Sequence, residues 1–185
     1  TTGAQLFADT IRCLRASGRQ ALSDIEFVIT GKGDMAASLQ ALAAQEGLPK
    51  VKFIGNVSRG DYVKAVQQAH VGMALKLPSS DLADTTFPSK VIELASAGLL
   101  VVSTRVSDVP ALFHEDGALY LNSEDPQELA ELLLWLVENK GEASRTAARG
   151  QAYIAETCSR EKVGQFLKAF FFPDGDMSLR KRSTQ

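Results

Sequence analysis

Short apolar runs alternate with helix-patterned segments along most of this chain, and that alternation limits the folds it can adopt. Strands that alternate with helices predict a parallel sheet with helices on both faces. The predicted fold class is therefore α/β, a doubly wound parallel sheet. The strand candidates are residues 25–30, 51–54, 71–77, 99–103 and 118–121, and the first of them is expected to be buried. The helix candidates are residues 4–17, 35–46, 58–69, 90–97 and 125–137.

The length of the chain favours one compact domain over two, because 185 residues is an ordinary size for a single α/β domain. From about Gly150 only helical patterns remain, and residues 173–185 are polar, with basic residues at 180–182. We expect a domain at 1–172 and a polar C-terminal tail at 173–185. The chain starts without a methionine or a signal peptide, so we expect it to be part of a longer protein.

The composition argues against several classes of partner. Apolar residues make up 45% of the chain, charged residues 23%, and the net charge is −2, so nucleic acid is not an expected partner. No apolar run approaches the roughly 20 residues that span a bilayer. Cys13 and Cys158 lack the spacing of a metal site, and we interpret them as small core residues of a reducing compartment, with a disulfide as the alternative. The expected location is cytoplasmic.

Ligands of open α/β sheets bind beyond the carboxyl ends of the strands, so the loops at those ends are the first places to inspect. Gly31, Lys32 and Gly33 follow the first predicted strand. Glycines at such a turn let main-chain amides approach an anionic ligand. The alternative is that a strand-to-helix turn needs glycine for its own backbone conformation.

A stronger signal is the helix start at Pro88-Ser89-Lys90-Val91. Proline is favoured at the first helical position, and the first amides of a helix have no partner inside it. The amides of Ser89, Lys90 and Val91 are therefore expected to point outward and bind phosphate. The Lys90 ammonium would add a charge-assisted hydrogen bond.

Glu93 lies one turn farther along the same helix, among apolar neighbours that predict a nearly buried environment. A carboxylate there needs hydrogen-bond partners, and a pair of ribose hydroxyls would supply two. The alternative is an ordinary surface ion pair between Lys90 and Glu93. No catalytic residue is assigned, because His70 and His114 form no recognisable triad or metal set and are left as structural or exposed.

The chain resembles the C-terminal domain of glycosyltransferase family 4, the glycosyl transferases group 1. The resemblance runs from about Phe27 to Ala169. It implies the GT-B fold, in which two Rossmann-like domains face each other and the C-terminal one holds most of the donor. It rests on five fragments in family order: Phe53-Ile54-Gly55-Asn56-Val57, Pro78-Ser79, Glu93-Leu94-Ala95-Ser96-Ala97-Gly98, Val101-Val102-Ser103-Thr104 and Asp125-Pro126-Gln127-Glu128-Leu129-Ala130.

The resemblance also implies a function. The donor would be a UDP-, GDP- or ADP-sugar, and no other cofactor and no metal is expected. An N-terminal domain outside this chain would hold the acceptor, so the isolated chain is expected to be inactive. Transfer with retention, and peripheral association of the full-length enzyme with the cytoplasmic face of a membrane, are further expectations.

Two departures from the family pattern bear on the site. The family carries two glutamates eight positions apart; the second, which holds the ribose, corresponds to Glu93, and the first, which contacts the sugar, falls on Thr85. We expect Asp84, Thr85 and Thr86 to act on sugar choice. The family's first strand and its arginine would precede Thr1, and its lysine before a glycine appears here as Thr2-Gly3. Lys90 and Lys32 are expected to replace part of that charge.

Two alternatives remain open at this point. The missing carboxylate at Thr85 is compatible with a catalytically inactive homologue that binds a nucleotide sugar or a partner. The strand pattern alone is also compatible with an unrelated doubly wound small-molecule-binding module, such as half of a periplasmic-type sugar receptor.

Overall fold

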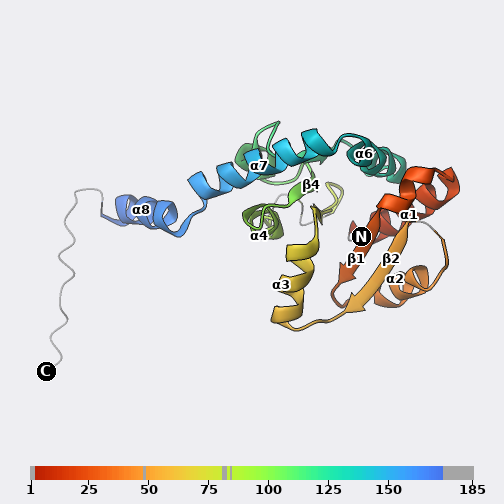
Figure 1. The fold of residues 1–185 in the computed structure, drawn as a ribbon. Helices are drawn as coiled ribbons and strands as arrows, with labels where there is room; N and C mark the ends of the chain where they lie inside the picture. Colours follow the sequence, from red (N-terminus) through yellow and green to blue (C-terminus); the bar gives the residue numbers. More distant parts are fainter. Residues whose placement is uncertain (1–2, 48, 81–82, 84, 173–185) are drawn as a thin grey trace, which may run out of the picture.

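The computed structural model describes residues 3–47, 49–80, 83 and 85–172, so Asp84 and the predicted tail at 173–185 lie outside the described residues. Strands and helices alternate through the first two thirds of the chain, as predicted (Figure 1). The strands are β1 (Glu26–Thr30), β2 (Lys50–Gly55), β3 (Val71–Ala74), β4 (Leu100–Thr104) and β5 (Leu119–Leu121). The helices are α1 (Gly3–Ser17), α2 (Ala36–Ala43), α3 (Arg59–Gln68), α4 (Lys90–Ser96), α5 (Val109–Phe113), α6 (Pro126–Glu138), α7 (Lys140–Thr157) and α8 (Arg160–Phe171), with a 3-10 turn η1 (Gln20–Asp24).

All strand pairs are parallel, but the five strands divide into two sheets, with the orders β1-β2 and β3-β4-β5. The prediction of parallel strands is confirmed, and no strand among the described residues joins the two sheets. β1 and β3 each pair on one side only among these strands. The strand that the family resemblance implies ahead of Thr1 stays a prediction.

β4 separates two hydrophobic cores, and all five of its residues are buried. Because successive side chains of a strand point to opposite faces, Leu100 and Val102 pack in the first core while Val101 packs in the second. The first core also receives α1, α2 and α6, and the second receives α4, α5 and α7. Helices therefore cover both faces of the β3-β4-β5 sheet, as expected for a doubly wound fold.

β1 is less buried than its apolar sequence predicts. Phe27 is buried and Ile29 packs against the first core, but Val28, on the opposite face, is 49% exposed. The prediction of a buried strand is therefore wrong for one of its two faces, because only the side that carries Phe27 is covered.

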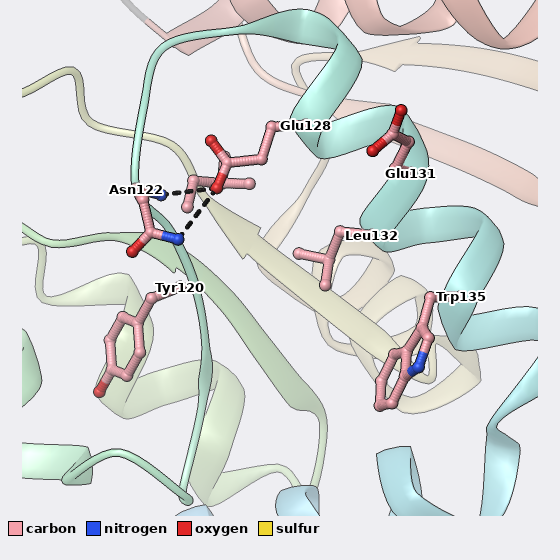
Figure 2. A pocket seen from close by; sticks show the side chains of 7 residues that line it. Tyr120, Asn122, Glu128, Glu131, Leu132 and Trp135 are labelled. Atoms are coloured by element: carbon pink, nitrogen blue, oxygen red, sulfur yellow. Dashed lines mark hydrogen bonds between the residues drawn. The ribbon is translucent and has the colours of Figure 1, made fainter.

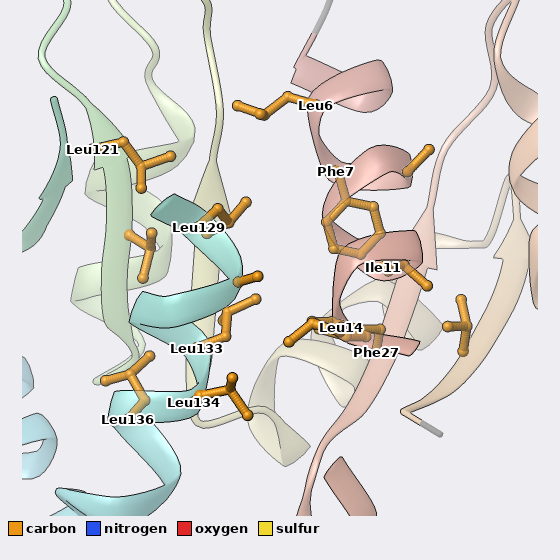
Figure 3. Close-up of a cluster of buried hydrophobic side chains, with 14 of the residues drawn as sticks. Leu6, Phe7, Ile11, Leu14, Phe27, Leu121, Leu129, Leu133, Leu134 and Leu136 are labelled. Carbon is orange, nitrogen blue, oxygen red and sulfur yellow. The ribbon is translucent and has the colours of Figure 1, made fainter. Parts of the chain in front are cut away.

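The helix α1 connects the two sheets through the first core. It packs along α6, and Figure 3 shows Leu6 and Leu14 directed toward the leucines of that helix. On the β1 side, the ring of Phe7 meets the ring of Phe27 edge to face, with centroids 5.1 Å apart. The helix begins against the end of β3, since a Cβ on Gly3 would lie 1.6 Å from the Leu75 carbonyl oxygen.

Both cysteines are free thiols, and each is partly buried against a core, Cys13 against the first and Cys158 against the second. The interpretation of both as small core residues is confirmed. The N-cap predicted for α6 is also confirmed, because the Asp125 carboxylate accepts a hydrogen bond from the Gln127 amide at 2.9 Å.

The last helix, α8, lies at the far end of α7, away from the strands (Figure 1). None of its residues is buried. Phe166, Phe170 and Phe171 are 68%, 67% and 65% exposed. No helix in the described part of the chain is long and apolar enough to cross a bilayer.

A matched pair of leucine truncations tests whether α1 holds the two sheets together. Leu14 is completely buried, whereas Leu167 on α8 is 45% exposed. We expect Leu14→Ala to lower the free energy of unfolding by about 2–5 kcal/mol, because it removes transfer energy and leaves a cavity. Leu167→Ala should stay within about 0.5 kcal/mol of the parent. Urea denaturation of both variants checks this, and equal losses would contradict it.

Candidate functional site

The segment between β3 and α4 brings together the residues predicted from the helix start. Thr85, Thr86, Ser89, Lys90 and Glu93 all lie on it or on the first turn of α4, beyond the carboxyl end of β3. Each is exposed. The other predicted group, residues 31–33, follows β1 and so belongs to the other sheet. The predicted site is thus split between two strand ends.

Close packing under α4 decides which of its residues face outward. Val91, Leu94 and Ala95 are buried, and Leu94 lies over Gly72 of β3 so closely that a Cβ there would be 2.8 Å from its side chain. This contact fixes the helix on the sheet and leaves Lys90 and Glu93 exposed. The prediction of a nearly buried Glu93 is wrong, because the helix has seven residues and buries one face only.

Glu93 and Lys90, both within the described residues, form no ion pair with each other. The neighbour of Glu93 is instead Tyr62 on α3. Burial of the phenol, and then the charge and hydrogen bonding of the Glu93 carboxylate, raise the pKa of Tyr62. The carboxylate is therefore placed beside a hydroxyl group and exposed to solvent, where it can accept further hydrogen bonds.

The predicted set of three outward amides at the helix start is wrong. The Ser89 amide donates to the Phe87 carbonyl at 2.9 Å, and the Val91 amide donates to the Pro88 carbonyl at 3.0 Å. α4 begins at Lys90, later than the proline suggests, because a tight turn precedes the helix and takes up these donors. Of the three amides, all in the described part of the chain, only that of Lys90 is left for an anion.

In the loop after β1, the glycines serve the backbone conformation of the turn, which is the alternative to a phosphate-binding role. Gly31 and Gly33 have φ values of 128° and 153°, which favour glycine, and the Gly31 amide donates to the Gly55 carbonyl at 2.8 Å. The amide of Gly31 is therefore not turned toward a ligand. Lys32 between them is exposed.

Lys76 is a residue at the carboxyl edge that the sequence patterns do not single out. β3 ends at Ala74, so Lys76 lies beyond the strand and not within it as predicted. Its ammonium donates to the Thr86 carbonyl at 2.6 Å, to the Thr86 hydroxyl and to the Ala83 carbonyl at 3.4 Å. Lys76 thus holds the segment that carries Thr85.

Arg105, the first residue after β4, is a second basic side chain that was not predicted. Its guanidinium forms a bidentate pair with Glu115 at 2.9 and 2.7 Å and lies 4.5 Å from the centroid of the Tyr120 ring. The arginine lowers the pKa of the Glu115 carboxyl, first through its side-chain hydrogen bond. Burial is the main cause that raises the pKa of Tyr120 to about 12.

Ser79, in the predicted Pro78-Ser79 motif, joins the loop after β3 to the loop after β5. Its amide and its hydroxyl donate to the two carboxylate oxygens of Glu124 at 2.8 and 2.9 Å. These two hydrogen bonds, the amide first, lower the pKa of Glu124. The charged carboxylate therefore clamps the loop across the end of β4.

A surface hollow of about 330 Å³ lies beside the end of β5 and against α6 (Figure 2). None of the predicted donor-site residues lines it. Two glutamates and no basic residue line it, so it does not favour an anionic diphosphate. The lining residues are Tyr120, Leu121, Asn122, Glu128, Glu131, Leu132 and Trp135.

Comparison with known proteins assigns the family. Residues 1–139 match the family described as "Glycosyl transferases group 1". This chain belongs to the glycosyl transferases group 1. Membership in this family excludes the alternative of an unrelated doubly wound module. The family proposed from the five sequence fragments is therefore confirmed.

Two curated glycosyltransferases are similar to this chain over about two thirds of its length. The amylovoran biosynthesis glycosyltransferase AmsK of Erwinia amylovora is 31% identical over 120 residues, which cover 64% of this chain and 29% of that protein. The D-rhamnosyltransferase WbpZ of Pseudomonas aeruginosa is 27% identical over 132 residues, covering 70% and 34%. The match thus spans about a third of the length of these relatives.

Solved structures agree with the predicted fold. The structure of Anabaena Alr3699/HepE in complex with UDP has a TM-score of 0.73 and 18% identity, and the match covers 92% of this chain and 45% of that one. TarM has a TM-score of 0.68 and 16% identity, with 92% and 32% covered. The Rossmann-like fold of a GT-B half is confirmed for this group 1 chain.

The Ser79–Glu124 contact predicts a pH-dependent loop. A carboxyl whose pKa is lower in the folded protein is ionised at neutral pH and loses its contact as the pH falls through the lowered pKa, below the ordinary value of about 4.3. We expect the NMR shift of the Ser79 amide to titrate with a midpoint below that value. Glu124→Gln should abolish this titration. A midpoint at or above the ordinary value would show that the clamp is absent in solution.

Proposed function

We propose that this chain is the donor-binding domain of a glycosyltransferase, which holds a UDP-, GDP- or ADP-sugar and presents its anomeric carbon to an acceptor. The observation that carries the proposal is the placement of Lys90 and Glu93. Both are exposed on the first turn of α4, beyond the carboxyl end of β3, and they are not paired with each other. In a chain of this family, an exposed cation and an exposed carboxylate whose neighbour is the Tyr62 phenol suit a diphosphate and a ribose at that edge.

Lys90 is proposed to face the diphosphate, because an ammonium donates charge-assisted hydrogen bonds to phosphate oxygens. Glu93 is proposed to accept hydrogen bonds from the ribose hydroxyls, with Tyr62 beside it. The exposed hydroxyl of Thr85 is proposed to contact the sugar, together with Thr86. The complexes of Anabaena Alr3699/HepE with UDP and with UDP-glucose support this class of ligand.

Sugar transfer is proposed for the whole enzyme, with a second domain that holds the acceptor. In the reaction the bond between the anomeric carbon and the diphosphate breaks, the anomeric carbon bonds to the oxygen of an acceptor hydroxyl, and that hydroxyl releases its proton. The departing diphosphate gains negative charge, which a cation at Lys90 stabilises. Retention of configuration is part of the proposal and rests on the family resemblance.

A catalytically inactive homologue is the second candidate, and Thr85 is the observation that favours it. A threonine hydroxyl carries no charge at the position where the family pattern has a carboxylate. Both candidates bind a nucleotide sugar, so donor hydrolysis and transfer by the complete protein separate them. Turnover that is lost in Glu93→Gln would favour the enzyme.

The exposed phenylalanines of α8, Phe166, Phe170 and Phe171, are expected to contact another surface in the whole protein, because apolar patches of this kind mark contact surfaces. We propose that the acceptor-binding domain covers this face of α8. Peripheral association with the cytoplasmic face of a membrane is the second proposal for the same face. It is supported by the amphipathic sequence of α8, in which Lys162 and Lys168 accompany the phenylalanines.

Single substitutions at Lys90 and Glu93 test the donor site by calorimetry. Lys90→Met should weaken UDP or GDP by about 1–2 kcal/mol and leave the uncharged nucleoside unchanged, since an exposed charged hydrogen bond lies at the low end of its range. Glu93→Gln should weaken diphosphate and nucleoside alike, by about 1 kcal/mol, because both carry the ribose. Lys64→Met, an exposed lysine on α3 that pairs with Asp61, is the control. If all variants bind as the parent does, the site is not there.

Sedimentation with lipid vesicles tests whether the exposed face of α8 contacts the acceptor-binding domain or a membrane. We expect the chain not to sediment with vesicles of phosphatidylcholine and phosphatidylserine at physiological salt, because its proposed cover is protein. A double variant, Phe166→Ser with Phe170→Ser, should behave like the parent in this assay. Sedimentation of the parent that the double variant loses would assign the face to a membrane instead.

A further inference from the structure

Lys76 is held at the end of β3 by the main chain around it. Its amide donates to the Ala74 carbonyl at 3.2 Å, and its carbonyl accepts a hydrogen bond from the hydroxyl of Thr104, the last residue of β4. Thr104 is completely buried. The base of the lysine side chain is therefore fixed to the two neighbouring strands of the sheet.

The loop that Lys76 contacts has mostly local main-chain bonds of its own. The Ser80 amide donates to the Leu77 carbonyl and the Ala83 amide to the Ser80 carbonyl, and the main-chain bonds of the other described residues of this loop are similarly short turns. Turns of this kind shape a loop but do not fix it relative to a sheet. Within the described residues, two polar side-chain tethers do so: Glu124 holds the loop at Ser79, and Lys76 holds it at Ala83 and Thr86.

The hydrogen-bond partners of Lys76 indicate a different role from that proposed for Lys90. Its ammonium has three N–H groups, and three of the contacts it makes are with oxygens of this loop. An ammonium that gave up these oxygens for a phosphate would leave the carbonyl of the buried Ala83 without this donor, which is costly. Ala83 is only 4% exposed, so its carbonyl has little access to water.

We propose that Lys76 is a positioning residue that holds Ala83 and Thr86 in place and thereby fixes where Thr85 presents its hydroxyl. The ligand at Thr85 is the sugar part of the donor, so in this respect the inference rests on the proposed function. Lys76 then affects how much more tightly the site binds a nucleotide sugar than the free nucleotide. It does not act as a ligand of the diphosphate.

Three variants test this role: Lys76→Met removes the donors, Lys76→Arg keeps a cationic donor, and Lys140→Met is the control. Lys140 is an exposed lysine at the start of α7 that pairs with Asp24 at 3.3 Å, far from the loop in sequence. The first measurement is hydrogen–deuterium exchange at residues 85–89 of the ligand-free chain. Lys76→Met should accelerate this exchange about tenfold, as the loss of a charged hydrogen bond does. Lys76→Arg should largely restore the parent rate, and Lys140→Met should not change it.

The second measurement compares the dissociation constants of UDP and UDP-glucose, and then of GDP and GDP-mannose, for the same variants. Lys76→Met should weaken the nucleotide sugar about five- to tenfold while the free nucleotide stays within about twofold, and Lys76→Arg should recover most of the difference. Equal weakening of nucleotide and nucleotide sugar, with a dependence on salt, would make Lys76 a diphosphate ligand and overturn the inference. Unchanged exchange in Lys76→Met would also overturn it.

The two measurements keep this inference separate from the proposed function. If the parent binds none of the four ligands, the proposed donor site fails, while the exchange rates still decide whether Lys76 holds the loop. If the parent binds them and Lys76→Met changes neither the exchange nor the ratio of the two constants, the donor site stands and Lys76 has no positioning role.

Discussion

The burial of β4 on both faces is the constraint on which the rest of the structure depends. Leu100 and Val102 point into one core and Val101 into the other, so helices must cover both sides of this strand. The last two residues of β4 are polar and also buried, and their hydroxyls donate to main-chain carbonyls of the neighbouring segment, Ser103 to Ala74 and Thr104 to Lys76. The strand that organises the cores therefore also fixes the main chain where β3 passes into the candidate site.

The site inherits its geometry from this framework at a few points of close contact. Gly72 lets α4 approach β3, which sets the direction in which Lys90 and Glu93 face. Lys76 and Glu124 then attach the intervening loop to the ends of β3 and β5. The helix is held by its buried face, whereas the described main-chain bonds of the loop before it are mostly local turns. The charged tethers thus supply an order that the local turns of the loop do not.

Sequence patterns predict the strands and helices well because each of these elements buries an apolar face, and the spacing of apolar residues reflects that burial. They locate the ends of elements less well. The apolar run 71–77 extends beyond β3, which ends at Ala74, because Leu77 is buried without belonging to the strand. The predicted strand therefore included Lys76, and its position in the loop was missed. The hydrogen-bond partners of the Ser89 and Val91 amides could not be predicted from the sequence either. The Phe87 and Pro88 carbonyls accept from these amides only once the turn has formed. Lys90 and Glu93 lie on one helical turn as predicted, but Glu93 was expected to be nearly buried and is exposed.

The basic residues at the strand ends differ in what occupies their donors, and this difference is the strongest guide to the proposed anion site. Arg105 is engaged by Glu115 and Asn122, and Lys76 contacts oxygens of its own loop. Lys32 and Lys90, in the part of the chain that the structure describes, have no hydrogen bond or ion pair through their ammonium groups. A cation already paired must lose those bonds before it can bind phosphate, and the loss offsets most of the gain. An exposed and unpaired ammonium has only water to displace. By this criterion Lys90, one turn from Glu93, is the residue best placed to meet a diphosphate, and Lys32 would reach it only if the ends of β1 and β3 face the same ligand.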